Sequence, residues 1–168
     1  MTTTRRAGAW WMLAASVALV ALVAALGTLA TTSNVEGWYA AADKPVWTPP
    51  DWVFGPVWSI LYLAMAYAAW RVWLTPDSRA RTTALVLYLV QLVLNGVWSP
   101  LFFAGYPIWG AAALWAASVV IVVLAVTILA TIVAFHRVDK SAAYILVPYL
   151  AWVLYASTLN LGVAALAT

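Results

Sequence analysis

Residues 82–135 read TTALVLYLVQLVLNGVWSPLFFAGYPIWGAAALWAASVVIVVLAVTILATIVAF and contain no charged side chain. One membrane crossing takes about 20 apolar residues, so this stretch is too long to be a single transmembrane helix. Proline and glycine interrupt helices, and the run SPLFFAGYP at 99–107 holds both residue types. The stretch therefore predicts two membrane spans, at 82–103 and 109–135, with a break between them.

Three further apolar runs are long enough to cross a membrane, at 9–30, 52–73 and 142–165. The whole chain of 168 residues is 67% hydrophobic and only 8% charged. Soluble domains, by contrast, carry about 25% charged residues. We therefore predict an all-α integral membrane protein, a five-transmembrane-helix bundle that forms one domain over 1–168.

The basic residues are divided unequally between the two sides of such a bundle. Lys44 lies on one side, and the other seven lie at the N-terminus or in the loops after the second and fourth spans: Arg5, Arg6, Arg71, Arg79, Arg81, Arg137 and Lys140. Because loops rich in Lys and Arg stay in the cytoplasm, the N-terminus and loops 2–3 and 4–5 are predicted to be cytoplasmic. The loop between the first two spans and the C-terminus are then outside, and the expected location is a bacterial plasma membrane.

The sequence lacks the side chains that most catalytic and metal centres need. It has no cysteine and one histidine, His136, which stands beside Arg137 in a predicted loop. Structural zinc and haem sites use such ligands, so we expect no metal site and no resident cofactor. The five carboxylates lie in loops or at span ends, which argues against a conventional hydrolase or metalloenzyme. The basic residues stand singly or in pairs beside apolar runs and do not indicate nucleic-acid binding.

Three of the predicted spans carry aromatic rings and amides on one helical face. Residues three or four apart share a face of a helix, and this spacing links three sets: Trp58, Tyr62 and Met65; Gln91, Asn95, Trp98 and Phe102; Tyr149, Trp152, Ala156 and Asn160. An unpaired amide in hydrocarbon is costly. The amides therefore either hydrogen-bond between helices or, with the aromatic rings, line a cavity for a large, flat, mainly apolar molecule.

The loop at 31–51 between the first two spans is predicted to be a rigid lid. It belongs to the run GWYAAADKPVWTPPDWVFGPVW at 37–58, in which prolines prevent a helix and tryptophans supply apolar surface to bury. The lid residues are Trp38, Tyr39, Lys44, Pro45, Pro49 and Pro50. The alternative is an interfacial loop that rests on the lipid headgroups.

Four sets of motifs run in order through most of the chain: Trp38-Tyr39 with Lys44-Pro45 and Pro49-Pro50; Phe54-Gly55-Pro56-Val57-Trp58 with Leu61-Tyr62; Gln91 with Leu94-Asn95 and Trp98; and Pro148-Tyr149-Leu150-Ala151-Trp152 with Thr158-Leu159-Asn160. In these residues the sequence resembles the TspO/MBR family, the translocator proteins or peripheral benzodiazepine receptors, in its bacterial type. The resemblance implies a five-helix membrane receptor, usually a homodimer. It also implies that porphyrins such as protoporphyrin IX are bound, sensed or transported, and in many members sterols and benzodiazepine-type ligands are bound as well.

The resemblance further implies positions for the ligand. Carried over by motif, the ligand-binding pocket would be lined by Trp47, Trp58, Tyr62, Asn95, Trp98, Trp152 and Ala156. On the lid side, Lys44 is the available cation for a porphyrin carboxylate. The residues after Asn160 lack the tyrosine and arginine of the sterol motif in animal members, so no sterol site is expected there.

Two further implications concern activity and assembly. Some bacterial relatives are reported to promote light-dependent porphyrin breakdown, and the resemblance then gives the catalytic role to Trp58 and Trp152. Small residues at four-residue spacing allow close helix contact and make a homodimer plausible: Ala112 with Ala116, and Ala113 with Ala117. Four functions remain open at this point: receptor, porphyrin-degrading enzyme, transporter, and packing subunit of a larger complex.

Overall fold

The computed structural model describes residues 3–167, with side chains from residue 10 to residue 167. Every regular element in these residues is helical: α1 (Thr3–Val35), α2 (Trp38–Ala41), the 3₁₀-helix η1 (Asp51–Val53), α3 (Phe54–Trp73), α4 (Arg79–Phe103), α5 (Tyr106–Trp109), α6 (Ala111–His136), α7 (Lys140–Ile145) and α8 (Val147–Leu166). The prediction of an all-α fold is therefore confirmed.

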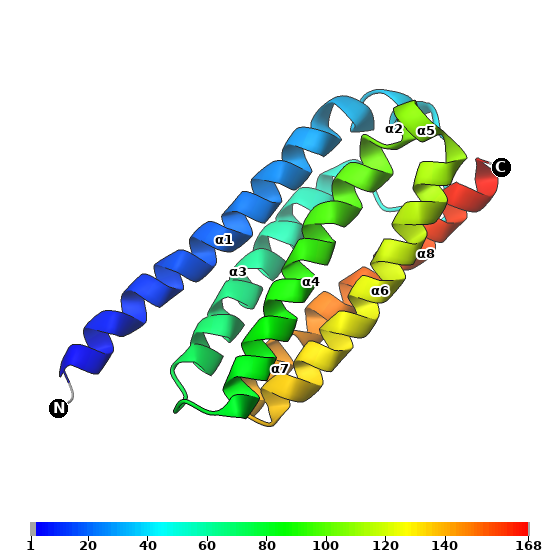
Figure 1. Cartoon of the computed structure of the whole chain (residues 1–168). Helices are drawn as coiled ribbons and strands as arrows, with labels where there is room; N and C mark the ends of the chain where they lie inside the picture. The colour runs from blue at the N-terminus through cyan, green and yellow to red at the C-terminus, as the bar shows by residue number, and fades with distance from the viewer. Residues whose placement is uncertain (1–2, 168) are drawn as a thin grey trace.

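Five stretches of the described chain are helical, long and apolar enough to cross a membrane: Trp10–Val35, Asp51–Trp73, Arg79–Phe103, Ala111–His136 and Lys140–Leu166. In Figure 1 the helices lie side by side, with α1 at one edge of the bundle and α8 behind α6. The helix α1 packs against α3 and α4, whereas α6 packs against α4 and α8. Residues 36–50, between α1 and η1, are called the lid segment below. The lid segment, α5 and the C-terminus share one end of the bundle, and the α3–α4 and α6–α7 connections share the other.

One helix is longer than predicted, and another passes through a proline before ending at the predicted residue. The helix α1 continues to Val35 rather than ending at residue 30, and within its last turns Thr31 Oγ1 donates to Gly27 O at 2.6 Å. The helix α4 passes through Pro100 and ends at Phe103. Ala104 N and Gly105 N then both donate to Pro100 O, which closes the last turn.

The last predicted span consists of two helices, α7 and α8, that meet at Leu146. Pro148 lies in the first turn of α8, where its missing N–H costs nothing, but its ring prevents a continuous α-helix through this point. The hydrogen bond from Leu150 N to Leu146 O continues the chain into α8 at 3.1 Å. Tyr149, in the first turn of α8, lies in the bundle interior and is 1% exposed.

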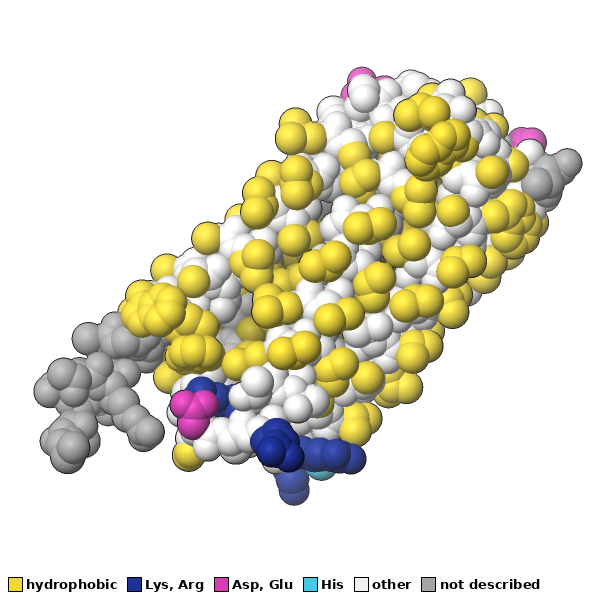
Figure 2. Space-filling view, in the orientation of Figure 1, with side chains coloured by type: hydrophobic (Ala, Val, Ile, Leu, Met, Phe, Trp, Pro, Cys, Tyr) yellow, Lys and Arg dark blue, Asp and Glu magenta, His cyan; other side chains and the backbone are white. Residues whose placement is uncertain are grey.

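The outside of the bundle is apolar along its length and charged at its ends. Figure 2 shows hydrophobic side chains over the long faces of the visible helices, with Lys and Arg gathered at the end opposite the lid. Trp10, Trp11 and Trp109 are exposed at span ends, as expected for indoles at a membrane interface. The chain is therefore an integral membrane protein whose apolar faces meet lipid.

Ion pairs hold the loops at the end opposite the lid. Arg71 at the end of α3 donates through Nη2 to Asp139 Oδ2 at 2.9 Å and through Nε to the same oxygen at 3.1 Å. Asp139 also caps α7, because its Oδ1 accepts from Ala142 N at 3.0 Å. In the α3–α4 loop, Arg81 pairs with Asp77. The Asp139 carboxylate therefore joins the end of α3 to the start of α7.

We expect Asp139→Asn to lower the stability of the protein at pH 7 by about 1 kcal/mol, because asparagine keeps the cap and loses the ion pair. Burial raises the pKa of Asp139, but hydrogen bonds from Ala142 N–H and Arg71 outweigh this effect and hold the pKa below its ordinary value. A carboxyl whose pKa falls on folding stabilises the protein above its ordinary pKa. This stabilisation is lost as the pH falls below about 4.

Thermal unfolding in detergent between pH 7 and pH 3 measures this effect. The difference between the wild-type protein and Asp139→Asn is expected to shrink as the pH falls. Asp43→Asn is the matched control, because Asp43 is exposed in the lid segment and has no ion pair among the described residues. Equal unfolding temperatures for wild type and Asp139→Asn at pH 7 would contradict the assigned role.

Candidate functional site

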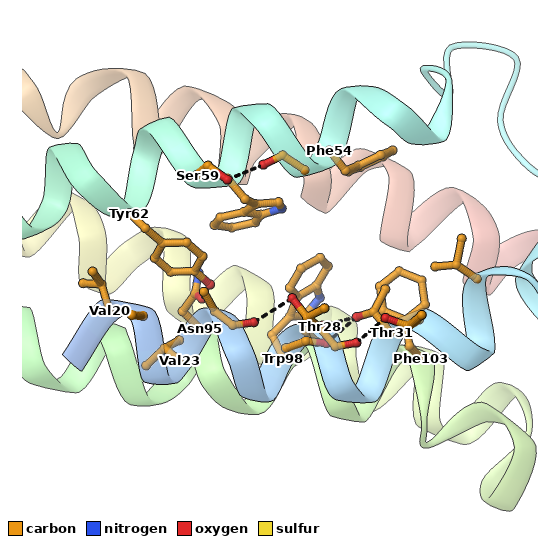
Figure 3. Close-up of a pocket in the computed structure, with 18 of the residues that line it drawn as sticks. Val20, Val23, Thr28, Thr31, Phe54, Ser59, Tyr62, Asn95, Trp98 and Phe103 are labelled. Atoms are coloured by element: carbon orange, nitrogen blue, oxygen red, sulfur yellow. Dashed lines mark hydrogen bonds between the residues drawn. The ribbon is translucent and has the colours of Figure 1, made fainter. Parts of the chain in front are cut away.

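A cavity of about 590 Å³ lies between α1, α3 and α4 beneath the lid segment. Figure 3 shows side chains of α3, such as Ser59 and Tyr62, facing Thr28 and Thr31 of α1 across this space. The α1 wall is made of small or short side chains, including Ala24 and Gly27. Because these side chains are short, the helix backbones leave room between them, and the volume is within the range of cavities that hold drug-sized ligands.

Aromatic rings form the wall of the cavity opposite α1. Trp58 of α3 stacks on Tyr62 with 5.5 Å between ring centroids, and its centroid lies 6.3 Å from that of Trp98 of α4. Phe54 and Phe103 line the part of the cavity nearer the lid. Such rings offer broad apolar faces on which a flat molecule can stack.

A chain of hydrogen bonds fixes the inner end of the cavity. Tyr62 Oη donates to Asn95 Oδ1 at 2.7 Å, Asn95 Nδ2 donates to Tyr149 Oη at 3.1 Å, and Tyr149 Oη donates to Gln91 Oε1 at 2.7 Å. These bonds join α3, α4 and α8. Gln91 and Asn95 therefore bond between helices, which was one of the two alternatives, while Asn95 also lines the cavity.

Asn160 holds the indole of Trp98 in place. Trp98 Nε1 donates to Asn160 Oδ1 at 2.9 Å, and Asn160 Nδ2 donates to Leu114 O at 3.1 Å and to Ser118 Oγ at 2.9 Å. Asn160 is 1% exposed, so these bonds are made away from water. One amide thus ties α4, α6 and α8 together and sets the orientation of a cavity ring.

The first half of the lid segment is anchored over the α4–α5 connection. Trp38 Nε1 donates to Phe103 O at 2.8 Å, and the Trp38 ring stacks on Tyr106 with 4.0 Å between centroids. Tyr39 is buried beside them, and this burial, with a smaller contribution from the charge of Asp51, raises the pKa of Tyr39 to about 12. The phenol therefore stays protonated at neutral pH.

The second half of the lid segment rests on α8. Trp47 Nε1 donates to Thr158 Oγ1 at 3.2 Å, and Tyr155 Oη donates to Trp47 O at 2.8 Å. The ring of Pro45 packs directly against Gly162, so closely that a Cβ at that glycine would overlap it. The segment is thus attached to the helix bundle at both halves, and its role as a lid over a ligand stays a prediction.

We expect Gly162→Ala to displace the second half of the lid segment, because the added methyl group overlaps the ring of Pro45. A proline ring is closed on its own backbone nitrogen and cannot rotate away. Overpacking of this kind costs about 1 to 3 kcal/mol. The measurement is the rate of limited proteolysis within the lid segment, which is expected to rise. In the control Gly96→Ala, the new methyl group lies 3.6 Å from Val23 Cγ1, an ordinary contact, and the rate stays at the wild-type value. Equal rates for Gly162→Ala and wild type would contradict the contact.

The structure places the predicted ligand-binding residues in two groups. Four of them line the cavity, namely Trp58, Tyr62, Asn95 and Trp98. The other three, Trp47, Trp152 and Ala156, lie outside its lining. Of the predicted lid residues Trp38, Tyr39, Lys44, Pro45, Pro49 and Pro50, Tyr39 reaches the cavity.

The three outlying residues have other neighbours. Trp47 is 53% exposed in the lid segment, and Ala156 is 4% exposed in the core of the bundle. The ring of Trp152 packs edge-on against Phe54 at 5.8 Å and beside Tyr155 at 5.5 Å, and its buried Nε1 has no hydrogen-bond partner in the described part of the chain. Their role in ligand binding stays a prediction.

The α1 wall was missed by the sequence reasoning, which found only hydrophobicity in the first span. Its residues in the lining include Val20, Val23, Gly27, Thr28, Thr31 and Thr32. A signal was present, because Gly27, Thr28, Thr31 and Thr32 place small or hydroxyl side chains on one part of an otherwise aliphatic helix. However, small and hydroxyl side chains on one helical face are equally typical of ordinary close packing between membrane helices.

The charged groups at the site are few. No group of three or more His, Cys, Asp or Glu that could hold a metal ion occurs among residues 3–167. Lys44 lies outside the cavity lining, with its Nζ 4.6 Å from the centre of the Tyr39 ring, whereas Asp51 belongs to the lining. The site is therefore an apolar and aromatic cavity with hydroxyl groups and one carboxylate.

Comparison with known proteins agrees with this architecture. Residues 16–166 match the model of the TspO/MBR family. The chain is 41% identical to the translocator protein of Sus scrofa over 83% of this chain and 82% of that protein. It is 38% identical to the tryptophan-rich protein TspO of Archaeoglobus fulgidus over 90% and 94% of the two chains, and 37% identical to the tryptophan-rich sensory protein of Cereibacter sphaeroides over 82% and 84%. This five-span membrane protein belongs to the TspO/MBR family.

Proposed function

We propose that this protein is a membrane receptor that binds a flat, hydrophobic ligand of the tetrapyrrole class in the cavity beneath the lid. The observation that carries the proposal is the aromatic wall, in which Trp58 and Trp98 lie 6.3 Å apart beside a cavity of about 590 Å³. Indole rings with fixed orientations stack on flat conjugated molecules at little entropic cost. The Asn160 hydrogen bond supports this by holding one of the two rings in place.

The cavity also offers hydrogen-bond partners for polar substituents on the ligand. Thr28 and Ser59 are exposed in its lining, on α1 and α3 respectively. Their hydroxyls already donate to carbonyls of their own helices, Thr28 to Ala24 O and Ser59 to Gly55 O, so their oxygens keep the capacity to accept another bond. A few polar groups in an apolar cavity orient a ligand without dominating its affinity.

The names of the relatives, translocator protein and tryptophan-rich sensory protein, are consistent with binding that serves transport or sensing. We further propose that the N-terminus and the basic loops at the end opposite the lid face the cytoplasm, so that the lid faces outward. A homodimer through α6 would use Ala112 and Ala116, which are exposed, because Ala113 and Ala117 are buried inside the protomer.

Light-dependent breakdown of a bound porphyrin is a second candidate. The specific observation in its favour is that oxidisable rings line the cavity in contact with one another, with Trp58 stacked on Tyr62 at 5.5 Å. Trp152 lies outside the cavity lining. If breakdown requires contact between a tryptophan and the porphyrin, product formation is expected to depend on Trp58 and not on Trp152.

The test is a titration of detergent-purified protein with protoporphyrin IX in the dark, followed through quenching of tryptophan fluorescence. Saturable binding of one porphyrin per chain is expected. A linear, unsaturable change would overturn the proposed function. Illumination of the saturated complex in air then separates the two candidates: a receptor gives the same mixture of bleaching products as free porphyrin, and an enzyme gives one discrete product. A flux assay in liposomes distinguishes transport from sensing.

A further inference from the structure

Among the described residues that line the cavity, one carries an acidic side chain, Asp51. The other polar lining groups in the described chain are hydroxyls, an amide and indole or phenol rings. A negative charge at the edge of a cavity with apolar walls acts on any charged ligand, because the walls exclude water and weaken screening.

The side chain of Asp51 is accessible to a ligand in the cavity. Asp51 is the first residue of η1 and is exposed where the lid segment joins α3. Within residues 3–167 its carboxylate forms no ion pair and accepts no hydrogen bond. The group is therefore not neutralised by the protein itself.

The basic residue of the lid does not balance this charge inside the cavity. Lys44 lies outside the lining, and its Nζ lies 4.6 Å from the centre of the Tyr39 ring. The ammonium group of Lys44 is engaged in this cation–π contact. The sequence-based expectation that Lys44 pairs with a porphyrin carboxylate is therefore not supported by its position.

We propose that Asp51 sets the charge preference of the cavity, so that it takes flat apolar ligands with neutral or cationic substituents in preference to dianionic ones. This inference rests on the proposed function, since it concerns the ligand of the same cavity. Repulsion between two like charges at a largely solvated site changes affinity roughly tenfold. Neutral carbonyl or ester groups avoid this repulsion.

The experiment compares two probes of equal shape, protoporphyrin IX as its dianion and protoporphyrin IX dimethyl ester, which is neutral. Each is titrated against the wild-type protein, Asp51→Asn and Asp43→Asn at pH 7.5 in detergent. Asp43→Asn makes the same change of charge in the lid segment, at an exposed residue outside the cavity lining. Thermal unfolding of each variant checks that all three proteins are equally folded.

We expect Asp51→Asn to tighten binding of the dianion about tenfold and to leave binding of the ester unchanged. Asp43→Asn is expected to change neither affinity by more than about twofold, because Asp43 lies outside the cavity lining and the intervening water and salt screen its charge. This pattern assigns the charge preference to Asp51.

The opposite outcomes separate the two proposals. If both porphyrins bind saturably and Asp51→Asn alters neither affinity, the charge preference is wrong and the proposed function stands. If Asp51→Asn and Asp43→Asn tighten dianion binding equally, a general effect of surface charge replaces the role of Asp51. If neither porphyrin binds saturably to any of the proteins, the proposed function is overturned and the charge preference falls with it.

Discussion

Replacing Trp58 by alanine is expected to weaken porphyrin binding at least tenfold, which corresponds to about 1.4 kcal/mol. Trp58 provides the central ring of the cavity wall, between Tyr62 at 5.5 Å and Trp98 at 6.3 Å. Its removal takes away the largest stacking surface and leaves a space that the ligand cannot fill. Titration in the dark measures the loss, and Trp58→Phe, which keeps an aromatic face of smaller area, is expected to lose less.

Two control variants separate stacking from a general loss of tryptophan. Trp109 is 62% exposed on α5, so Trp109→Ala is expected to bind porphyrin as the wild-type protein does. Trp152→Ala is the more informative comparison, because the family resemblance gives Trp152 a ligand role and the structure places it outside the cavity lining. A loss in Trp152→Ala without a loss in Trp58→Ala would move the ligand towards α8 and contradict the proposed cavity.

Replacing Asn160 by leucine lowers the stability of the bundle by about 2 to 4 kcal/mol, since three interhelical hydrogen bonds of about 1 kcal/mol each are lost. The substitution leaves the buried Trp98 Nε1 without its acceptor, Asn160 Oδ1 at 2.9 Å, whereas Ser118 Oγ keeps its bond to Leu114 O. It also frees the Trp98 ring to turn within the cavity wall. Both unfolding temperature in detergent and porphyrin affinity are therefore expected to fall.

Ser157→Ala is the matched control on the same helix. Ser157 is buried as Asn160 is, but its hydroxyl donates only to Val153 O of α8, at 2.7 Å. Its loss is expected to cost well under half as much as the loss of Asn160. A double-mutant cycle with Trp98→Phe then measures the coupling across the Trp98–Asn160 hydrogen bond. Additive effects in this cycle would show that the two side chains do not act together.

Some of the candidate site is visible in the sequence because helical periodicity is local. Tyr62, Asn95 and Trp98 lie on the faces that the spacing of aromatic residues and amides picks out, and in the structure all three line the cavity. The same periodicity selects Trp152 and Ala156, which face the core and Phe54 rather than the cavity. A repeat of three or four residues assigns side chains to one face of a helix. It does not say which neighbouring helix that face meets.

The five membrane spans can be predicted from the sequence, since the length and hydrophobicity of each apolar run decide whether it crosses a bilayer. The uneven distribution of basic residues between the two ends of the bundle, and the proline-rich segment between the first two spans, can also be seen in the sequence. Only the tertiary structure decided that α1 forms the cavity wall, that Asn160 fixes Trp98, and that Asp51 rather than Lys44 borders the cavity. The physical reason is that these arrangements are contacts between residues far apart in the chain. Such contacts depend on how the helices pack against one another, which no single span encodes.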